Sequence, residues 1–251
     1  MLAVVQARYS STRLPGKVLK KIGDKVVLEM IMERLNQSRC IDEVVIATSN
    51  KNSDNVIEDF CKKNNFKIFR GSLDDVLERF YLVALKYKAE NILRITGDCP
   101  FIDHETIDEI IINHCKKEYD YFGLGGDFPD GLDCTCFSFK ALKESYLKAE
   151  LPSEREHIGQ YIENNAGLFK TGEINKFQQY KNLRITLDEP EDLELMNRII
   201  MEWPESLNIL KTENVLGFLE KKLDLIKINQ HISRNEGLKK SLKSEELRKN
   251  E

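Results

Sequence analysis

The first half of the chain alternates short apolar runs with stretches whose apolar residues recur every three or four positions. The apolar runs predict four strands, at 2–5, 43–48, 67–71 and 91–96. The periodic stretches predict helices at 28–35, 54–64 and 75–87, and a further helix that begins after Asp103. Strands and helices that alternate in this way are typical of a parallel sheet joined by right-handed crossovers.

The pattern becomes less regular after about residue 118. Strands are predicted at 119–124, 132–139, 167–171 and 183–187, and a helix at 189–201. This order favours a mixed sheet that extends the parallel half. We therefore expect one α/β domain over residues 1–230, with a mixed, mostly parallel central sheet flanked by helices. A charged tail, 231–251, follows it, and we expect no chemistry there.

Composition narrows the class of protein. Of the 251 residues, 41% are hydrophobic and 32% are charged, with a net charge of −4, as in soluble globular proteins. The lack of a basic excess argues against nucleic-acid binding. No apolar run reaches the roughly 18 residues of a membrane span and no signal-peptide pattern is present, so a cytoplasmic location is expected. The six cysteines are scattered and form no zinc motif, so reduced, mostly buried thiols are expected.

A polar, basic loop follows the first strand. It carries Arg8, Arg13 and Lys17, three hydroxyl residues at 10–12 and a Pro-Gly turn. Backbone N–H groups and cationic side chains converge at the carboxyl end of such a strand, and three cations suit a triphosphate better than one carboxylate. The loop has neither Walker nor dinucleotide-binding spacing. On charge alone, an ordinary charged surface loop is the alternative.

Two acidic residues follow later strands. Asp98 lies in the run RITGDCPFID (94–103), where Gly97 permits close backbone approach and Asp98 offers a hard oxygen ligand to Mg²⁺. Asp188 lies in the run LRITLDEPEDL (183–193), two residues before a proline that begins a helix. The alternatives are a simple turn at Asp98 and helix capping by the acids after Asp188. A shared sheet would bring the ends of both segments together to hold Mg²⁺.

The loop QARYSSTRLPGKVL (6–19) resembles the signature loop of the cytidylyltransferase family, which includes the synthetases that make CMP-KDO and CMP-acylneuraminate. The greatest likeness is to the branch labelled spore coat polysaccharide biosynthesis protein F, and it extends to about residue 195. The resemblance implies a Rossmann-like, glycosyltransferase-A-like nucleotidyltransferase domain. It also implies that Asp98 is the primary Mg²⁺ ligand and that Asp188 completes the metal site.

The same resemblance implies roles for further residues. The catalytic residues would be Arg13, Lys17 and Asp98. The nucleotide-binding residues would be Gln6, Ala7, Arg8, Ser10, Ser11, Arg13, Lys17, Arg70, Thr96 and Gly97. Acceptor contacts would come from Arg79 and Asp133, although a helical pair of Asp75 with Arg79 accounts equally well for that arginine. His157 is expected to be structural or interfacial, because no nucleophile signature accompanies it.

The expected reaction is attack by an oxygen of a sugar acid or phosphorylated acceptor on the α-phosphorus of CTP, with loss of pyrophosphate. Mg²⁺ would neutralise charge, and Arg8, Arg13 and Lys17 would stabilise the leaving group. One alternative is a nucleotide-sugar-dependent glycosyltransferase, which the single aspartate in 97–99 disfavours. The others are transfer from another nucleoside triphosphate and a non-enzymatic nucleotide-binding protein. No motif identifies the acceptor or the residue that reads the base.

A homodimer is expected from the resemblance. Residues 151–165 offer an interface, because Ile158, Tyr161 and Ile162 recur at helical spacing. Burial of the same three residues in the protomer's own core is the alternative.

Overall fold

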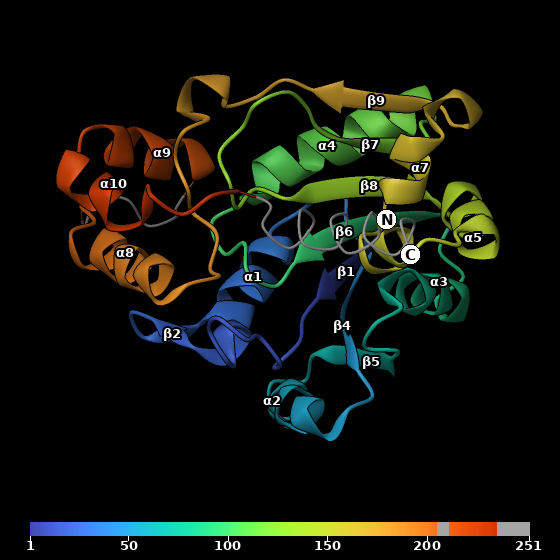
Figure 1. The fold of residues 1–251 in the computed structure, drawn as a ribbon, viewed down its shortest axis with the longest axis horizontal. Coiled ribbons are helices and arrows are strands. Elements are labelled where there is room, and N and C mark those ends of the chain that lie inside the picture. Colours follow the sequence, from blue (N-terminus) through green and yellow to red (C-terminus); the bar gives the residue numbers. More distant parts are fainter. Residues whose placement is uncertain (205–210, 235–251) are drawn as a thin grey trace, which may run out of the picture.

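A seven-stranded sheet forms the middle layer of the protein (Figure 1). The computed structural model describes residues 1–204 and 211–234. The strand order across the sheet is β5-β4-β1-β6-β8-β7-β9. In chain order these strands are β1 (Leu2–Gln6), β4 (Glu43–Ser49), β5 (Lys67–Gly71), β6 (Asn91–Thr96), β7 (Tyr121–Leu124), β8 (Cys134–Ser138) and β9 (Thr171–Ile174). A separate ribbon pairs β2 (Lys21–Ile22) with β3 (Lys25–Val26).

The pairing of the strands confirms the predicted mixed, mostly parallel sheet. β1 lies between β4 and β6 and is parallel to both, and β4 is parallel to β5. β8 is antiparallel to β6 and β7, whereas β7 is parallel to β9. The register aligns Gln6 with Thr96, the last residues of β1 and β6. The loops that follow these two strands therefore leave the sheet at the same edge.

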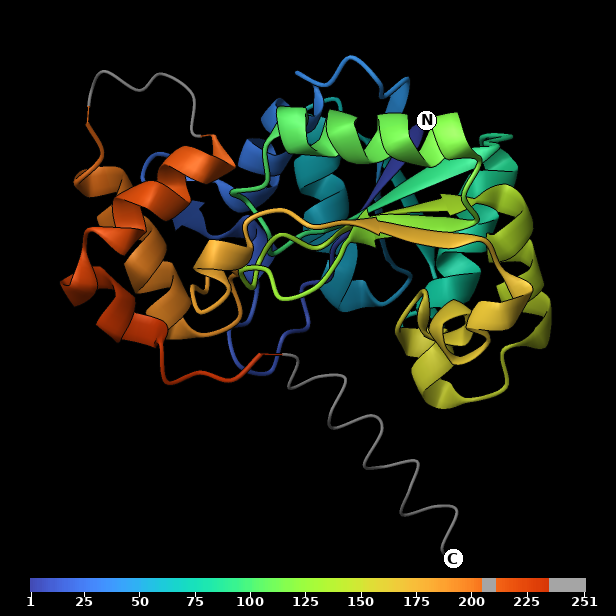
Figure 2. The same ribbon diagram turned by 90° about the horizontal axis from the view of Figure 1, so that it is seen from above.

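Helices cover both faces of the sheet (Figure 2). On one face lie α1 (Val27–Leu35), α2 (Asn55–Lys63) and α4 (His104–Lys117). The helices α8 (Pro190–Met201), α9 (Thr212–Glu220) and α10 (Leu223–Asn229) lie together beyond the ends of the strands and contribute to the same apolar core (Figure 1). On the other face lie α3 (Val76–Lys86), α5 (Phe139–Lys148), α6 (Pro152–Glu156) and α7 (Gln160–Asn164). Each face has its own apolar core because strand side chains alternate, Val5 packing into the first core and Val4 into the second.

Aspartates cap two helices in the structure, and the cap at Asp103 was predicted. Asp75 Oδ1 accepts a hydrogen bond from the Glu78 backbone N–H at 2.8 Å, and Asp103 Oδ1 accepts one from Thr106 at 2.7 Å. Asp103 also accepts a hydrogen bond of 2.7 Å from the Thr212 backbone N–H. The start of α4 is thereby tied to the start of α9.

The strand predicted at 183–187 is wrong. Leu183, Ile185 and Leu187 are buried, which produced the alternating pattern. Their segment instead crosses the edge of the sheet and bonds to two different loops: Ile185 N–H donates to the Asp130 carbonyl at 2.7 Å, and Leu187 N–H donates to the Asp98 carbonyl at 2.9 Å. Among the described residues, the strand pairing of this segment consists of one parallel bridge between Asp130 and Arg184.

Other boundaries also differ from the predictions. The strand predicted at 167–171 begins only at Thr171, because residues 166–168 form a 3₁₀ turn and β9 is defined by its pairing with β7. Helices α9 and α10 were not predicted. The charged tail predicted at 231–251 lies outside the described residues from position 235 onward.

The three apolar residues suggested for a dimer interface are buried within the protomer. Ile158, Tyr161 and Ile162 pack in the core beside α3 and α5. The alternative considered for them is therefore correct, and the expected homodimer has to rest on other surfaces. All six cysteines are free, and Cys134 and Cys136 are buried on one face of β8 as predicted. Within residues 1–204 and 211–234, no helix has the length and apolar character needed to cross a membrane.

Candidate active site

A buried aspartate holds the loop after β1 in place. The Tyr9 backbone N–H donates to Asp54 Oδ1 at 2.8 Å, and the other oxygen of Asp54 accepts from Thr48 Oγ1 at 2.9 Å and from the Ser49 backbone N–H at 3.0 Å. Burial opposes ionisation of Asp54, but these hydrogen bonds lower its pKa overall. The sequence pattern predicted only that a helix begins near Asp54, and the role of this residue as the anchor of the loop was missed.

The loop then folds back on itself at Gly16. Its N–H donates to the Tyr9 carbonyl at 2.9 Å, and its φ of 68° lies in the left-handed region. A Cβ atom at this position would lie 2.7 Å from the Tyr9 ring. The turn directs the next residue, Lys17, inward, and Lys17 is only 8% exposed.

Lys17 lies between two carboxylates. Its Nζ is 2.5 Å from Asp98 Oδ2 and 2.6 Å from Asp188 Oδ1. Burial alone would lower the pKa of Lys17, but the two aspartates raise it. Burial likewise opposes ionisation of Asp98, yet the Lys17 ammonium lowers the pKa of that carboxyl to about 2. The structure thus brings together the three residues that the sequence selected from three distant segments.

The approach of these segments depends on backbone contacts. Gly97 N–H donates to the Gln6 carbonyl at 2.8 Å, and a Cβ at Gly97 would lie 2.8 Å from that same oxygen. Glycine is needed here because any side chain would push β6 away from β1. On the other side, the hydrogen bond from Leu187 N–H to the Asp98 carbonyl sets Asp188 beside Asp98.

A second layer of buried polar residues holds Asp188. Asp192, which is fully buried, accepts from the backbone N–H groups of Asp188 and Glu189, both at 2.9 Å. It also accepts two hydrogen bonds of 2.8 Å from the guanidinium of Arg184 and one of 2.8 Å from Asn229 Nδ2. Asp192 therefore caps α8, as the capping alternative for the acids after Asp188 predicted. It also joins a hydrogen-bond network with Arg184 and Asn229. That network was not predicted, because its members lie on separate elements.

Arg13 extends the cationic side of the site. Its guanidinium lies 3.2 Å from Asp188 Oδ2 and 3.0 Å from Glu189 Oε1. Arg8 and Ser10, which precede Arg13 in the same loop, are exposed. The loop therefore presents one buried ammonium and two more accessible guanidinium groups at the edge of the sheet.

The remaining predicted nucleotide contacts of the loop and of β6 lie close to this edge. Gln6 is partly buried, and its Oε1 has no hydrogen-bond partner among the described residues. Ala7 is buried and its N–H donates to the Ala47 carbonyl at 3.1 Å. Ser11 Oγ accepts from the Leu14 N–H at 3.3 Å, and Thr96 Oγ1 donates to Cys99 Sγ at 2.8 Å.

Two arginines that were predicted to contact ligands donate hydrogen bonds to backbone carbonyls of the protein. Arg70 donates to the Ser49 and Lys51 carbonyls at 2.9 and 2.8 Å, which ties β5 to the loop after β4. Arg79 is buried, donates to the Ser72 carbonyl at 2.5 Å, and burial lowers its pKa to about 10. No ion pair with Asp75 forms among the described residues. A role of either arginine in binding ligands stays a prediction.

Asp133 lines a pocket next to the carboxylate pair. The pocket has a volume of about 320 Å³. Asp133 Oδ2 lies 4.0 Å from Cys99 Sγ, which in turn is 3.5 Å from Asp98 Oδ1. Burial raises the pKa of Asp133, and the nearby Arg94 and Arg234 partly offset that rise. His157 also lines this pocket.

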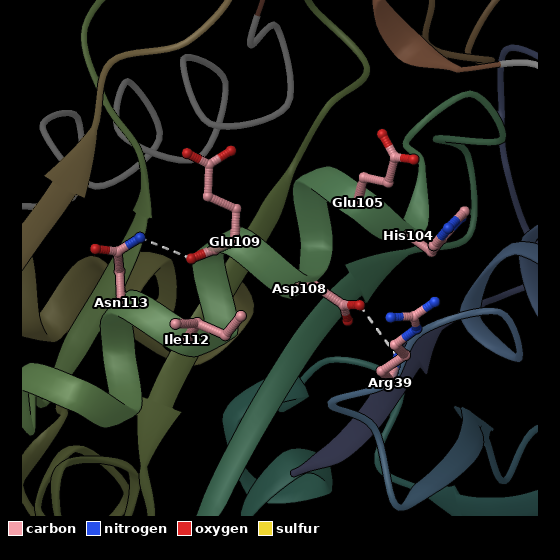
Figure 3. Close-up of a pocket in the computed structure, with 7 residues that line it drawn as sticks. All are labelled: Arg39, His104, Glu105, Asp108, Glu109, Ile112 and Asn113. Atoms are coloured by element: carbon pink, nitrogen blue, oxygen red, sulfur yellow. Dashed lines mark hydrogen bonds between the residues drawn. The ribbon is translucent and has the colours of Figure 1, made fainter.

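A second hollow lies on the outer face of α4 (Figure 3). Its lining includes Arg39, His104 and Asp108, and the Arg39 backbone N–H donates to Asp108 Oδ2 at 3.1 Å. None of the residues that the sequence predicted for the site lines this hollow. We therefore assign the chemistry to the edge of the sheet where β1 and β6 end.

The carboxylate pair fits a divalent cation. Oxygens of Asp98 and Asp188 both lie within 2.6 Å of one cationic atom, the Lys17 Nζ, so they converge on a position suited to positive charge. No cluster of three or more His, Cys, Asp or Glu side chains that could hold a metal occurs in the described part of the chain. Two carboxylates with phosphate oxygens and water are a common set of Mg²⁺ ligands.

Comparisons with known proteins agree with the geometry. The family model described as cytidylyltransferase matches residues 2–227. The chain is 33% identical over 236 residues to "Uncharacterized protein MJ1063" of Methanocaldococcus jannaschii, covering 92% of this chain and 95% of that protein. It is 33% identical over 227 residues to spore coat polysaccharide biosynthesis protein SpsF of Bacillus subtilis, covering 85% and 91%.

The structure of a cytidylyltransferase from Leptospira borgpetersenii superposes with a TM-score of 0.83. The two are 31% identical, and the alignment covers 89% of this chain and 95% of the other. Both the fold and the resemblance inferred from the opening loop are thereby confirmed. The chain belongs to the cytidylyltransferase family.

Proposed function

We propose that the protein transfers CMP from CTP to an acidic sugar or phosphorylated acceptor, with release of pyrophosphate. The observation that carries the proposal is the buried Lys17 ammonium between Asp98 and Asp188, at the end of the family's signature loop. This arrangement concentrates opposite charges at the edge of the sheet where nucleotides bind in α/β folds. The resemblance to SpsF supports a place in surface polysaccharide biosynthesis.

The loop cations would bind the triphosphate. Arg8 and Arg13 are accessible enough to contact phosphate oxygens directly, and Arg13 already lies at the carboxylate pair. Lys17 would exchange its carboxylate partners for oxygens of the leaving pyrophosphate. Donors held in place in this way stabilise the negative charge that develops as the P–O bond breaks.

Asp98 and Asp188 would hold Mg²⁺, which when bound supplies charge neutralisation to the phosphates. The protein's own contribution is to fix the two carboxylates side by side. The backbone contacts of Gly97 and Leu187 do this from one side, and Asp192 does it from the other. In-line displacement at phosphorus requires positioning and charge neutralisation more than a protein nucleophile.

Pyrophosphate release tests the proposal. The protein would be incubated with Mg²⁺, a panel of sugar acids and sugar phosphates, and CTP, UTP, GTP or ATP in turn. We expect release with CTP and one class of acceptor, and a CMP-linked product by mass spectrometry. Release with GTP or UTP in preference to CTP would overturn the choice of base. Without a productive acceptor, CTP should still raise the melting temperature more than the other triphosphates, through mass action.

A further inference from the structure

Arg94 interrupts the apolar pattern of the central strand β6. In the sheet register it lies beside Val4, and Ile92 precedes it on the same face; both neighbours are fully buried. A charged side chain on this face loses hydration, which is unfavourable unless the charge is paired with an opposite charge and hydrogen-bonded. The presence of an arginine at position 94 therefore indicates a functional role and not a role in packing the core.

The neighbouring strands place a hydroxyl group beside Arg94. Thr135 of β8 is its partner in the register, and Gly123 of β7 is in turn the partner of Thr135. A Cβ at Gly123 would lie 3.0 Å from the Cys134 carbonyl and 3.4 Å from Thr135 Oγ1. Arg94 and Thr135 both line the 320 Å³ pocket. This volume is in the range of small-molecule sites.

A second arginine lines the pocket from the distant end of the described chain. The Arg234 guanidinium stacks on the Phe128 ring, 4.3 Å from its centroid, and Nη1 donates to the Phe128 carbonyl at 2.5 Å. The Nε atoms of Arg94 and Arg234 are both buried and have no hydrogen-bond acceptor within the described residues. Buried charged donors without acceptors are costly, so the pair points to an anionic ligand that supplies them.

Two acidic side chains, Glu163 and Asp133, also line the pocket, and Asp133 lies near both arginines. Glu163 is exposed and accepts a hydrogen bond of 2.9 Å from the Tyr121 hydroxyl. Asp133 is partly buried and reaches toward Cys99, which contacts Asp98. Asp133 is thus on the side of the pocket that faces the carboxylate pair.

We propose that this pocket binds the acceptor, with the acceptor's anionic group at Arg94 and Arg234 and a hydroxyl group at Asp133. The proposal rests on the proposed function and adds the residues that would hold the acceptor and the orientation in which they would hold it. The anion would be held at the far side of the pocket, so that the hydroxyl side faces the α-phosphorus. A neutral sugar of the same size would bring no negative charge to the two arginines, so we expect it to bind more weakly than an anionic one.

Thermal unfolding of the full chain tests the proposal. The probes are glucuronate and 3-deoxy-manno-octulosonate as carboxylates, glucose 6-phosphate as a phosphate, and glucose as the neutral control, each with and without a non-hydrolysable CTP analogue. We expect one anionic class to raise the melting temperature by about 3 °C or more at saturation, and glucose to have no effect. The class of sugar that raises the melting temperature shows whether the pocket recognises a carboxylate or a phosphate.

Arg94→Gln and Arg234→Gln should each abolish the shift by the anionic sugar and keep the shift by the CTP analogue. Arg39→Gln, an exposed arginine outside the pocket, is the matched control and should keep both. If Arg94→Gln fails to fold, Arg234→Gln decides alone. An equal shift by glucose, no shift by any anionic sugar, or a shift that survives both substitutions would overturn the proposal. Failure of the proposed function would be recognised separately, by the absence of any shift with the CTP analogue in the unmodified protein.

Discussion

The Leu187 backbone N–H donates a hydrogen bond of 2.9 Å to the carbonyl oxygen of Asp98. This contact joins a segment that was expected to be a strand to the loop after β6. It places Asp188, the next residue, where its carboxylate and that of Asp98 share the Lys17 ammonium. The geometry of the candidate site therefore depends on main-chain contacts as much as on the charged side chains.

Asp98→Asn should reduce turnover by about 10²-fold or more, equivalent to about 2.7 kcal/mol of transition-state stabilisation. The amide keeps the size of the side chain but removes the charge that a metal and Lys17 require. Pyrophosphate release at saturating CTP and Mg²⁺ measures the loss. Asp74→Asn, at an exposed position, is the control. Activity near that of the unmodified protein would remove Asp98 from the mechanism.

Lys17→Met should increase the affinity for Mn²⁺ in the absence of nucleotide by at least about tenfold. The Lys17 ammonium is at the position where a cation would contact both carboxylates. Its removal frees that position and leaves Asp98 without its ion-pair partner, whereas Asp188 keeps Arg13. Free Mn²⁺ can be measured by electron paramagnetic resonance. Lys25→Met, at an exposed lysine, serves as the control. An unchanged affinity would mean that lysine and metal do not compete.

Asp192→Ala should lower the free energy of unfolding by about 3 to 5 kcal/mol, because it leaves the Arg184 guanidinium buried without its principal partner. Urea unfolding followed by circular dichroism measures the change. Glu194→Ala, an exposed acid on the same helix, should change stability by less than about 0.5 kcal/mol. Similar stabilities of the two variants would contradict the structural role of Asp192.

His114 should make the protein less stable in mild acid. Burial lowers the pKa of His114 from 6.5 to about 4, so the folded chain keeps the ring neutral while the unfolded chain takes up a proton. Stability is therefore lost as the pH falls from about 6.5 toward 4, by about 3 kcal/mol in total. Urea unfolding at pH 7, 5.5 and 4.5 tests this, and His114→Gln should flatten the dependence. His104→Gln, a partly exposed histidine at the start of the same helix, should not.

Light scattering tests the expected homodimer. A dimer would have about twice the protomer mass of 29.1 kDa at micromolar concentration. Because Ile158, Tyr161 and Ile162 are buried in the protomer, Tyr161→Ala should destabilise the fold and not simply separate the subunits. A mass of 29.1 kDa across the micromolar range would rule out a stable dimer.

The sequence was sufficient to predict the parallel half of the sheet. It was also sufficient to select Lys17, Asp98 and Asp188, which the structure brings together. Each of these residues lies directly beside a regular element or a turn, where local pattern is informative. It failed at 183–187, because alternation of buried residues arises there from contacts with two loops and not from pairing with a strand.

The residues that support the site were missed for the same reason. Asn229 ends α10 and Arg234 follows it, both distant in sequence from the strands of the sheet. Only the folded arrangement brings Asn229 to Asp192 and Arg234 to the pocket. The engagement of Arg70 by backbone carbonyls also depends on a loop that no spacing reveals. Sequence motifs identify charged residues, but they do not identify the hydrogen-bond partners that lie far away in the sequence.

The contacts of Asn229 have a consequence for biosynthesis. Its side-chain amide donates to the Arg184 carbonyl at 3.1 Å and to Asp192 at 2.8 Å, so one of the last described residues secures the segment that carries Asp188. A ribosome makes the β1 loop first and Asn229 more than two hundred residues later. The nascent chain can thus form its parallel sheet early, while the second carboxylate is secured only near the end of translation. Truncated chains released before that point would keep the loop after β1, for which we propose triphosphate binding, and would lack the contacts that secure Asp188.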